Sequence, residues 1–191
     1  MLHNEATLTM KKTIAIDMDN VIVDIETNWI NFYEKEFGVR IEKEDLIGKP
    51  EDDAFPDAVA ARSLLYKPGF FRDAPVMPGA IEALTELAQD FEIYIVSAAM
   101  EFPNSLAEKY DWLAEHCPFI SWKNIIFCGD KSVIATDFLI DDHLKNLDFC
   151  KGIPVLFTAG HNINVTRHQR VNNWTEAVAF IKGSVPAEEM A

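Results

Sequence analysis

Basic residues, cysteines and long apolar runs are all scarce in this chain of 191 residues. Its 17 lysines and arginines are outnumbered by 31 aspartates and glutamates, and the formal net charge is −14. Because no stripe of basic residues offsets this negative charge, a nucleic-acid polymer is not an expected partner. A small anionic substrate is compatible with this composition only where a cation or local basic groups meet it.

The cysteines and the N-terminus indicate where the chain functions. Cys117, Cys128 and Cys150 are odd in number and have no metal-binding spacing, which predicts reduced thiols in a cytoplasmic protein. No apolar run reaches the length of a membrane span, so no membrane partner is expected, and the first ten residues are too polar for a signal peptide. We expect residues 1–9 to be an extension without a structural role.

An apolar run that ends in two carboxylates is the most informative stretch of the chain. Residues 14–16 are predicted as a buried strand, and Asp17, Asp19 and Asn20 follow it. Ligands bind at the carboxyl ends of strands in open α/β sheets. Two acids one residue apart repel each other, and a cation or a raised pKa on one of them relieves the repulsion. A turn capped by these side chains is the alternative interpretation.

The second half of the chain alternates between helix and strand patterns, and its 49% hydrophobic content is enough for one core. This alternation predicts a Rossmann-like α/β fold, with a parallel sheet covered by helices on both faces. The expected strands cover residues 91–96, 124–127, 138–140 and 154–157. The expected helices cover residues 80–89, 104–116 and 175–181.

Residues 25–73 interrupt this alternation directly after the first strand. Helices are predicted over residues 24–37 and 58–66, with no strand between them. We therefore expect a small helical cap inserted after the first strand and standing over the carboxyl edge of the sheet. The catalytic core would then comprise residues 10–24 and 74–182, and residues 183–191 would form a tail.

Polar side chains also follow three later strands of the predicted sheet. Ser97, Lys131 and the pair Asp141-Asp142 each come after a strand, and parallel strands place such residues at one edge. Taken singly, each has an ordinary alternative: a helix cap or turn for the serine and the aspartates, and a solvated loop position for the lysine. Their ordered recurrence after successive strands favours a functional site.

This order of residues resembles the four motifs of the haloacid-dehalogenase-like phosphatases, and most closely those of the 5'(3')-deoxyribonucleotidases. The resemblance spans roughly residues 14–157. Within the first motif, glycine more often stands where this chain has Asn20. Further matching segments are Phe70-Phe71, Pro78-Gly79-Ala80, the stretch 107–112 (AEKYDW) and Asp130-Lys131-Ser132.

The resemblance implies a Mg²⁺-dependent phosphomonoesterase that forms an aspartyl-phosphate. Asp17 would be the nucleophile, and Asp19 would protonate the leaving group and then activate water. Mg²⁺ would be held by Asp17, the backbone carbonyl of Asp19 and one acid of Asp141-Asp142, with Asp142 favoured as the direct ligand.

The resemblance also implies a set of phosphate and substrate contacts. Lys131, Ser97 and Asn20, with the backbone amides after Asp17, would bind the phosphate. The candidate substrate residues of the cap are Trp29, Phe70 and Phe71, for which core packing is the alternative.

A nucleoside monophosphate is the expected substrate, and a homodimer is the expected assembly. Ala98 stands where related nucleotidases often carry a second hydroxyl, and the stretch 47–56 lacks the tryptophan expected to stack a base. Two alternatives stay open: a phosphatase of another small ester such as a sugar phosphate, and a non-catalytic scaffold of the same fold.

Overall fold

Six parallel strands form a single sheet in the computed structural model, which describes residues 11–186. The strand order is β3-β2-β1-β4-β5-β6, so the order reverses between β1 and β4. Ligands of open α/β sheets bind at such a reversal. The predicted α/β fold is confirmed. The strand bounds are β1 Thr13–Ile16, β2 Glu92–Ser97, β3 Ile125–Phe127, β4 Phe138–Asp141, β5 Ile153–Phe157 and β6 Gln169–Val171.

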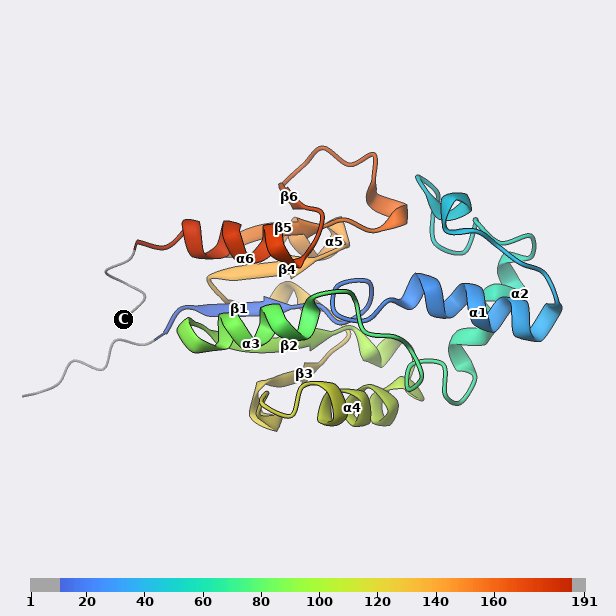
Figure 1. The fold of residues 1–191 in the computed structure, drawn as a ribbon, viewed down its shortest axis with the longest axis horizontal. Coiled ribbons are helices and arrows are strands. Elements are labelled where there is room, and N and C mark those ends of the chain that lie inside the picture. The colour runs from blue at the N-terminus through green and yellow to red at the C-terminus, as the bar shows by residue number, and fades with distance from the viewer. Residues whose placement is uncertain (1–10, 187–191) are drawn as a thin grey trace, which may run out of the picture.

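Helices cover both faces of this sheet (Figure 1). Helices α3, α4 and α6 bury their apolar residues against one face, and the short α5 packs on the other. The α-helices are α1 Ile25–Phe37, α2 Ala58–Ser63, α3 Ala80–Asp90, α4 Ser105–His116, α5 Leu144–Leu147 and α6 Trp174–Gly183. The 3₁₀ turns are η1 Lys43–Leu46, η2 Leu64–Tyr66, η3 Ala99–Glu101, η4 Trp122–Asn124, η5 Lys131–Val133 and η6 Gly160–Asn162.

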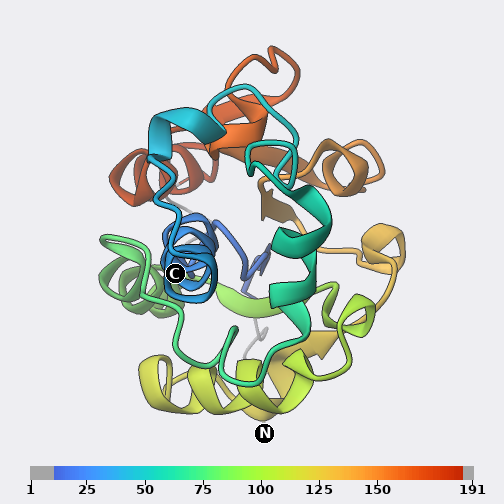
Figure 2. The same ribbon diagram turned by 90° about the vertical axis from the view of Figure 1, so that its right-hand side faces the viewer.

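Residues 25–73 contain helices and no strand, and they lie beyond the end of the sheet toward which the strands point (Figures 1 and 2). The two chain segments that lead into and out of this region pair with each other. Val23 forms an antiparallel bridge with Val76, and the N–H of Asp24 donates to the carbonyl of Pro75 at 2.8 Å. The helical segment therefore stands on a paired two-stranded stem.

Helix α1 begins and ends where its terminal residues satisfy the backbone. The Asp24 side chain accepts a hydrogen bond from the N–H of Thr27 at 3.0 Å, which caps the first turn. Gly38 follows the helix with φ +68°, a left-handed conformation that glycine adopts without steric cost. The N–H of Gly38 donates to the carbonyl of Glu34 at 2.8 Å and closes the last turn.

The sequence-based element boundaries were correct to within one or two residues for most elements. Strand β6 and helix α5 were not predicted, because three and four residues are too few to show a period. Helix α6 runs to Gly183 and Val185 is buried, so the expected tail does not begin at residue 183. Residues 1–9, expected to be an extension, and residues 187–191 lie outside the described residues.

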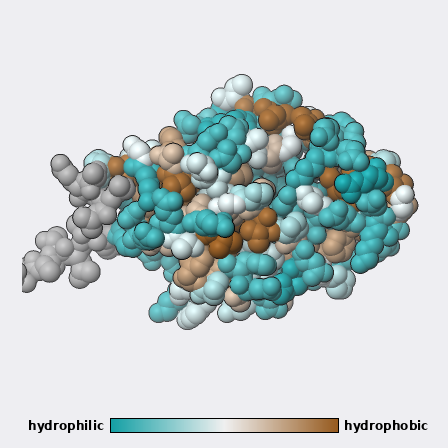
Figure 3. All heavy atoms as spheres, viewed as in Figure 1, coloured by the Kyte–Doolittle hydropathy of each residue, from teal (hydrophilic) through white to brown (hydrophobic). Residues whose placement is uncertain are grey.

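The surface seen in Figure 3 is mostly hydrophilic, with apolar residues scattered among polar ones. This agrees with the large excess of acidic residues in the sequence. Within residues 11–186, no helix has the length and apolar character needed to cross a membrane.

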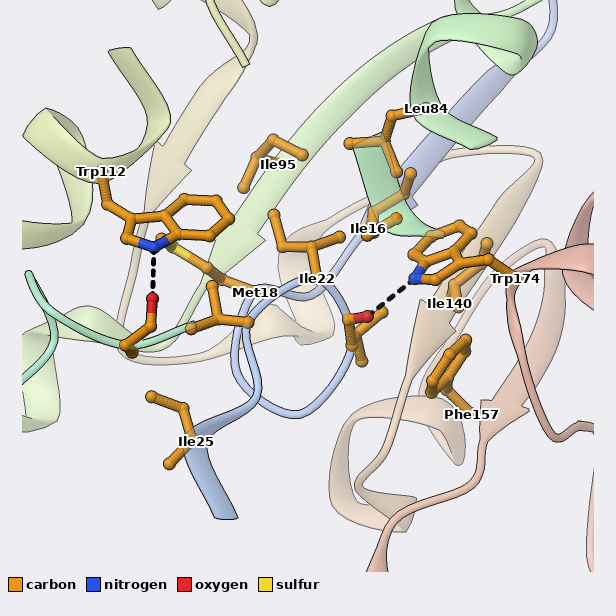
Figure 4. Packing of buried hydrophobic residues seen from close by; sticks show 14 of the residues in the cluster. Ile16, Met18, Ile22, Ile25, Leu84, Ile95, Trp112, Ile140, Phe157 and Trp174 are labelled. Carbon is orange, nitrogen blue, oxygen red and sulfur yellow. Dashed lines mark hydrogen bonds between the residues drawn. The ribbon is translucent and has the colours of Figure 1, made fainter. Parts of the chain in front are cut away.

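Two buried tryptophans fix the loop that follows β1 (Figure 4). Trp112 of α4 and Trp174 of α6 lie on either side of Met18 and Ile22, which are both almost fully buried. The indole N–H of Trp174 donates to the carbonyl of Val21 at 2.9 Å, and that of Trp112 donates to Ala74 at 2.8 Å. The loop that carries the two motif aspartates is thus anchored in the core.

Candidate active site

The loop after β1 turns tightly enough to bring two carboxylates to the same edge. The N–H groups of Ile22 and Val23 both donate to the carbonyl of Met18 at 3.0 Å. Asn20 has φ +56°, a left-handed conformation that glycine and asparagine tolerate better than other residues. This conformation explains why glycine commonly stands at this position in the family that the chain resembles.

Lys131 lies between two buried carboxylates. Its Nζ is 2.6 Å from Asp17 Oδ1 and 2.7 Å from Asp141 Oδ2, and the residue is only 3% exposed. Burial alone would lower the pKa of Lys131, but the two carboxylates outweigh it and raise that pKa, so the ammonium stays charged. Burial in turn raises the pKa of Asp17, against the opposing effect of Lys131.

The two acids after β4 differ sharply in their contacts. Asp141 is satisfied by protein donors: Lys131, the N–H of His143 at 2.9 Å, and the Asn146 amide at 2.9 and 3.0 Å. Asp142 is equally buried, yet its Oδ1 has no hydrogen-bond partner. Burial, with the nearby charges of Asp17 and Asp141, raises the pKa of Asp142 well above its ordinary value.

These contacts identify where a divalent cation would fit. One oxygen from each of Asp17, Asp141 and Asp142 lies within 4.8 Å of the others. Carboxylate oxygens are the ligands that hard cations such as Mg²⁺ prefer. Because Asp141 is already engaged by several donors, Asp142 has the freer oxygen for a metal.

Lys109 of α4 lies within the stretch 107–112 that resembles the family, but the sequence alone predicted no role for it. Its Nζ is 2.5 Å from Asp19 Oδ2 and 2.9 Å from Ser97 Oγ, and the residue is 2% exposed. The ammonium also lies 4.6 Å from the ring centroid of Phe71. The sequence spacing could have indicated that Lys109 is buried, because Lys109 shares the buried face of its helix with Trp112 and Leu113, three and four residues further on.

The structure places Ser97 and Asn20, the predicted phosphate contacts, at the site, where both contact protein groups. Ser97 is fully buried and accepts the hydrogen bond from Lys109 through its hydroxyl. The Asn20 amide contacts Glu51 at 3.2 Å and Asp142 at 3.3 Å, and its own N–H donates to the carbonyl of Val23. The donors of Asn20 are therefore used within the protein, and its side-chain amide holds the carboxylates of Glu51 and Asp142 in place.

A cavity of about 590 Å³ opens over these groups. Its lining combines the core residues Asp17, Asp19, Lys109, Lys131 and Asp142 with residues of the helical segment, which include Trp29, Arg62 and Phe71. This volume is within the range of pockets that take small-molecule ligands.

The three aromatic residues predicted to contact substrate have different positions. Trp29 and Phe71 line the cavity, and the indole N–H of Trp29 donates to the carbonyl of Ala61 at 2.9 Å. Phe70 is fully buried and packs edge-on against Trp29, Phe32 and Phe71, with ring centroids 5.0 to 6.3 Å apart. Phe70 therefore packs behind Trp29 and Phe71, which form the aromatic wall of the cavity.

Comparison with known proteins agrees with this geometry. A family model described as "5' nucleotidase, deoxy (Pyrimidine), cytosolic type C protein" matches residues 11–188. The 5'(3')-deoxyribonucleotidase of Bacillus subtilis strain 168 is 39% identical over 170 residues, which cover 87% of this chain and 96% of that protein. The protein of the same name from Bacillus phage SPbeta matches with the same figures.

Solved structures share the fold at much lower identity. A haloacid-dehalogenase-like hydrolase from Streptococcus pneumoniae has a TM-score of 0.60 at 16% identity, covering 91% of this chain and 99% of that one. A hydrolase of the same superfamily from Deinococcus radiodurans has a TM-score of 0.59 at 14% identity, covering 92% and 97%. The chain shares the fold of these hydrolases; it is a phosphoric monoester hydrolase, and it belongs to the deoxyribonucleotidase family described by the matching model.

Proposed function

We propose that this chain hydrolyses nucleoside monophosphates with Mg²⁺, through a phosphoryl group carried on Asp17. One observation carries the proposal: Asp17 and Asp19 line the same cavity, and each is held by a buried lysine. Lys131 holds Asp17, and Lys109 holds Asp19. The family relationship supports a nucleotide as substrate, because the relatives named above, from Bacillus subtilis and from Bacillus phage SPbeta, are deoxyribonucleotidases.

In the first step, a carboxylate oxygen of Asp17 attacks phosphorus and the ester P–O bond breaks. The leaving oxygen takes a proton from the carboxyl group of Asp19. Asp19 is suited to this role because Lys109 engages only its Oδ2, while its Oδ1 has no hydrogen-bond partner. The products of this step are the free nucleoside and a phosphoryl group bound to Asp17.

In the second step, the Asp19 carboxylate takes a proton from water, and that water attacks phosphorus. The bond to Asp17 breaks, and inorganic phosphate leaves. An anionic carboxylate must approach an anionic phosphate in the first step, and the charge of Lys131 lowers this repulsion.

Asp17, Asp142 and the backbone carbonyl of Asp19 would hold the magnesium ion. The unpartnered Oδ1 of Asp142 and the all-oxygen donor set fit such an ion. When bound, Mg²⁺ supplies positive charge that polarises the phosphoryl group. The protein side chains orient the substrate, and Asp19 transfers the protons.

The helical segment 25–73 would act as a cap that sets specificity. It supplies Trp29, Arg62 and Phe71 to the cavity lining, and it stands on the paired stem formed by Val23 and Val76. A cap that closes over substrate excludes bulk water and strengthens the electrostatic contribution of the two lysines. We also expect a cytoplasmic homodimer, which light scattering after gel filtration would test.

A panel of phosphate esters tests the function directly. We expect phosphate release from deoxynucleoside monophosphates to exceed that from sugar phosphates, to vanish in EDTA and to return with Mg²⁺. Ca²⁺ should not restore activity, because it favours larger and more flexible coordination than Mg²⁺. Full activity in the presence of chelator would contradict the metal assignment. A preference for sugar phosphates would contradict the nucleotide assignment.

A further inference from the structure

A second group of potential metal ligands lies beside the catalytic centre and shares Asp142 with it. Glu51, Asp142, His143 and His161 each offer one donor atom, and these four atoms lie within 4.8 Å of one another. The group differs in chemistry from the all-oxygen set around Asp17, because two of its four donors are imidazole nitrogens. No step of the proposed hydrolysis uses either histidine.

The donor atoms face one another across gaps too long for hydrogen bonds. His143 Nε2 is 3.7 Å from Glu51 Oε2 and 3.9 Å from Asp142 Oδ1. His161 Nδ1 is 3.8 Å from Glu51 Oε1. The two imidazole rings stack with centroids 4.4 Å apart and an interplanar angle of 19°. Since direct N–H···O contacts would be near 2.9 Å, these side chains surround a space and do not satisfy one another.

The tautomer of His161 makes this arrangement chemically specific. Its Nε2 lies 3.1 Å from the backbone carbonyl of Asp142, which can only accept, so Nε2 carries the proton. In the neutral ring of this tautomer, Nδ1 carries no proton. Its Nδ1 then presents a lone pair toward the carboxylate of Glu51. Two acceptors, His161 Nδ1 and Glu51 Oε1, therefore face each other at 3.8 Å.

Two atoms of the group are buried without any partner. They are His161 Nδ1 and Asp142 Oδ1, and Asp142 is 1% exposed. A buried acceptor without a donor is costly, and a cation satisfies several such atoms at once.

We propose that Glu51, Asp142, His143 and His161 form a second cation site, which binds a divalent transition ion of the Zn²⁺ class. Imidazole and carboxylate together suit Zn²⁺, Co²⁺ and Ni²⁺, whereas Mg²⁺ prefers oxygen ligands and retained water. In a tetrahedral site with bonds of 2.0 to 2.1 Å, ligand atoms are about 3.4 Å apart. The contacts of 3.7 to 3.9 Å would need to close by only a few tenths of an ångström.

An ion at this site would join two parts of the chain. Glu51 comes from the helical segment 25–73, whereas the other three ligands follow β4 and β5. The ion would therefore hold that segment against the sheet. Because this ion would also bind Asp142, it would compete with the magnesium ion of the proposed function, on which this inference rests, and would slow turnover.

Cobalt titration tests the site without measuring turnover. Co²⁺ bound by nitrogen and oxygen ligands in a tetrahedral site absorbs visible light, and the titration is done without Mg²⁺, which would compete for the shared Asp142. We expect one Co²⁺ per chain, displaced by Zn²⁺. His143→Asn and His161→Asn should each weaken binding at least about tenfold, since even the loss of an outer-shell partner costs that much. Glu51→Gln should weaken it as well.

His168→Asn is the matched control, because His168 contacts Asp148 at 2.7 Å and belongs to no part of this group. Its Co²⁺ affinity should equal that of the wild type. Asp17→Asn should also retain Co²⁺ binding, because Asp17 contributes only to the all-oxygen set. Thermal unfolding without ions verifies that each variant is folded.

Three results would overturn the proposal: no Co²⁺ binding, equal affinity in the wild type and both histidine variants, or loss of binding in His168→Asn. Binding lost in Asp17→Asn alone would place the ion at the all-oxygen set and would also overturn it. Failure of the phosphatase assay with Mg²⁺ leaves these binding results unaffected, so the two proposals fail separately.

Discussion

Replacing Lys109 by methionine tests the contact between the second buried lysine and the proposed acid. The Lys109 ammonium lies 2.5 Å from Asp19 Oδ2 and 2.9 Å from Ser97 Oγ. Methionine has a similar length, so Lys109→Met removes the charge and keeps much of the packing. A hydrogen bond that involves a charged group contributes roughly 1.5–3 kcal/mol. If that contribution acts in the transition state, kcat/KM should fall about 10- to 150-fold.

A comparison of two leaving groups tests whether Lys109 acts through Asp19. A nucleoside leaves as an alkoxide and needs the proton of Asp19, whereas p-nitrophenolate is stable without one. We expect Lys109→Met to reduce kcat/KM about 10- to 150-fold for a deoxynucleoside monophosphate and by much less for p-nitrophenyl phosphate. The assay compares initial rates on both esters with saturating Mg²⁺.

An equal loss on both esters would refute this reasoning and would show that Lys109 acts on the phosphate or on the fold. Lys182→Met is the matched control, because Lys182 pairs with Glu86 and Asp90 and does not line the cavity. It should retain wild-type rates. Lys109→Arg keeps the charge and should recover part of the activity on the nucleotide. Thermal unfolding of all variants separates a loss of rate from a loss of fold.

Three further predictions concern the nucleophile, the aromatic wall and the first helix cap. Asp17→Asn should abolish turnover and leave the circular dichroism spectrum unchanged, and substantial activity in the pure variant would rule out the covalent step. Phe71→Ala should lower kcat/KM for the preferred nucleotide far more than for p-nitrophenyl phosphate, and equal losses would make Phe71 a packing residue. Burial raises the pKa of Asp24, but hydrogen bonds from Thr27 and the contact with Lys43 outweigh it and leave that pKa below its ordinary 3.8. The charge of Asp24 therefore stabilises the fold above pH 3.8, and this contribution is lost as pH falls through the lowered pKa. The urea unfolding free energies of wild type and Asp24→Asn should differ at pH 7, by less than about 1 kcal/mol, and should converge as the pH is lowered below 3.8.

The strand-end residues could be predicted because topology alone brings them together. In a parallel sheet, residues that follow successive strands share one edge, and Asp17, Lys131 and Asp141 are indeed in direct contact. Contacts formed by helices and by the segment 25–73 could not be predicted in this way. Lys109 is 90 residues from Asp19 in the sequence, and its side chain reaches the site only because α4 packs its buried face toward the loop after β1.

The two histidines illustrate a different limit of sequence reasoning. His143 directly follows the predicted metal acids, and His161 lies in a loop after β5. A single histidine in a loop is most often an ordinary polar residue, and nothing in the spacing of these two indicates stacked rings. Their proximity to Glu51 depends on how the segment 25–73 sits over the sheet. That placement follows from tertiary packing and not from any local pattern.

Helix α4 connects the base of the helical segment to the proposed acid. The carboxylate of Glu108 accepts hydrogen bonds from the N–H groups of Gly69, Phe71 and Arg72 at 2.7, 3.0 and 3.2 Å. The next residue, Lys109, holds Asp19. A cap movement that carries residues 69–72 with it would have to break three charge-assisted hydrogen bonds to a half-buried carboxylate, which is costly.

The residues that follow Gly69 should therefore stay fixed to α4 while the rest of the segment moves. Phe71 would then keep its position over Lys109 in open and closed states, and it would form a constant part of the site. Arg62 is held more weakly, because it pairs with Glu101 where both side chains are exposed, and such pairs contribute little. Closure over a substrate should accordingly move Arg62 toward the sheet and leave Phe71 where it is.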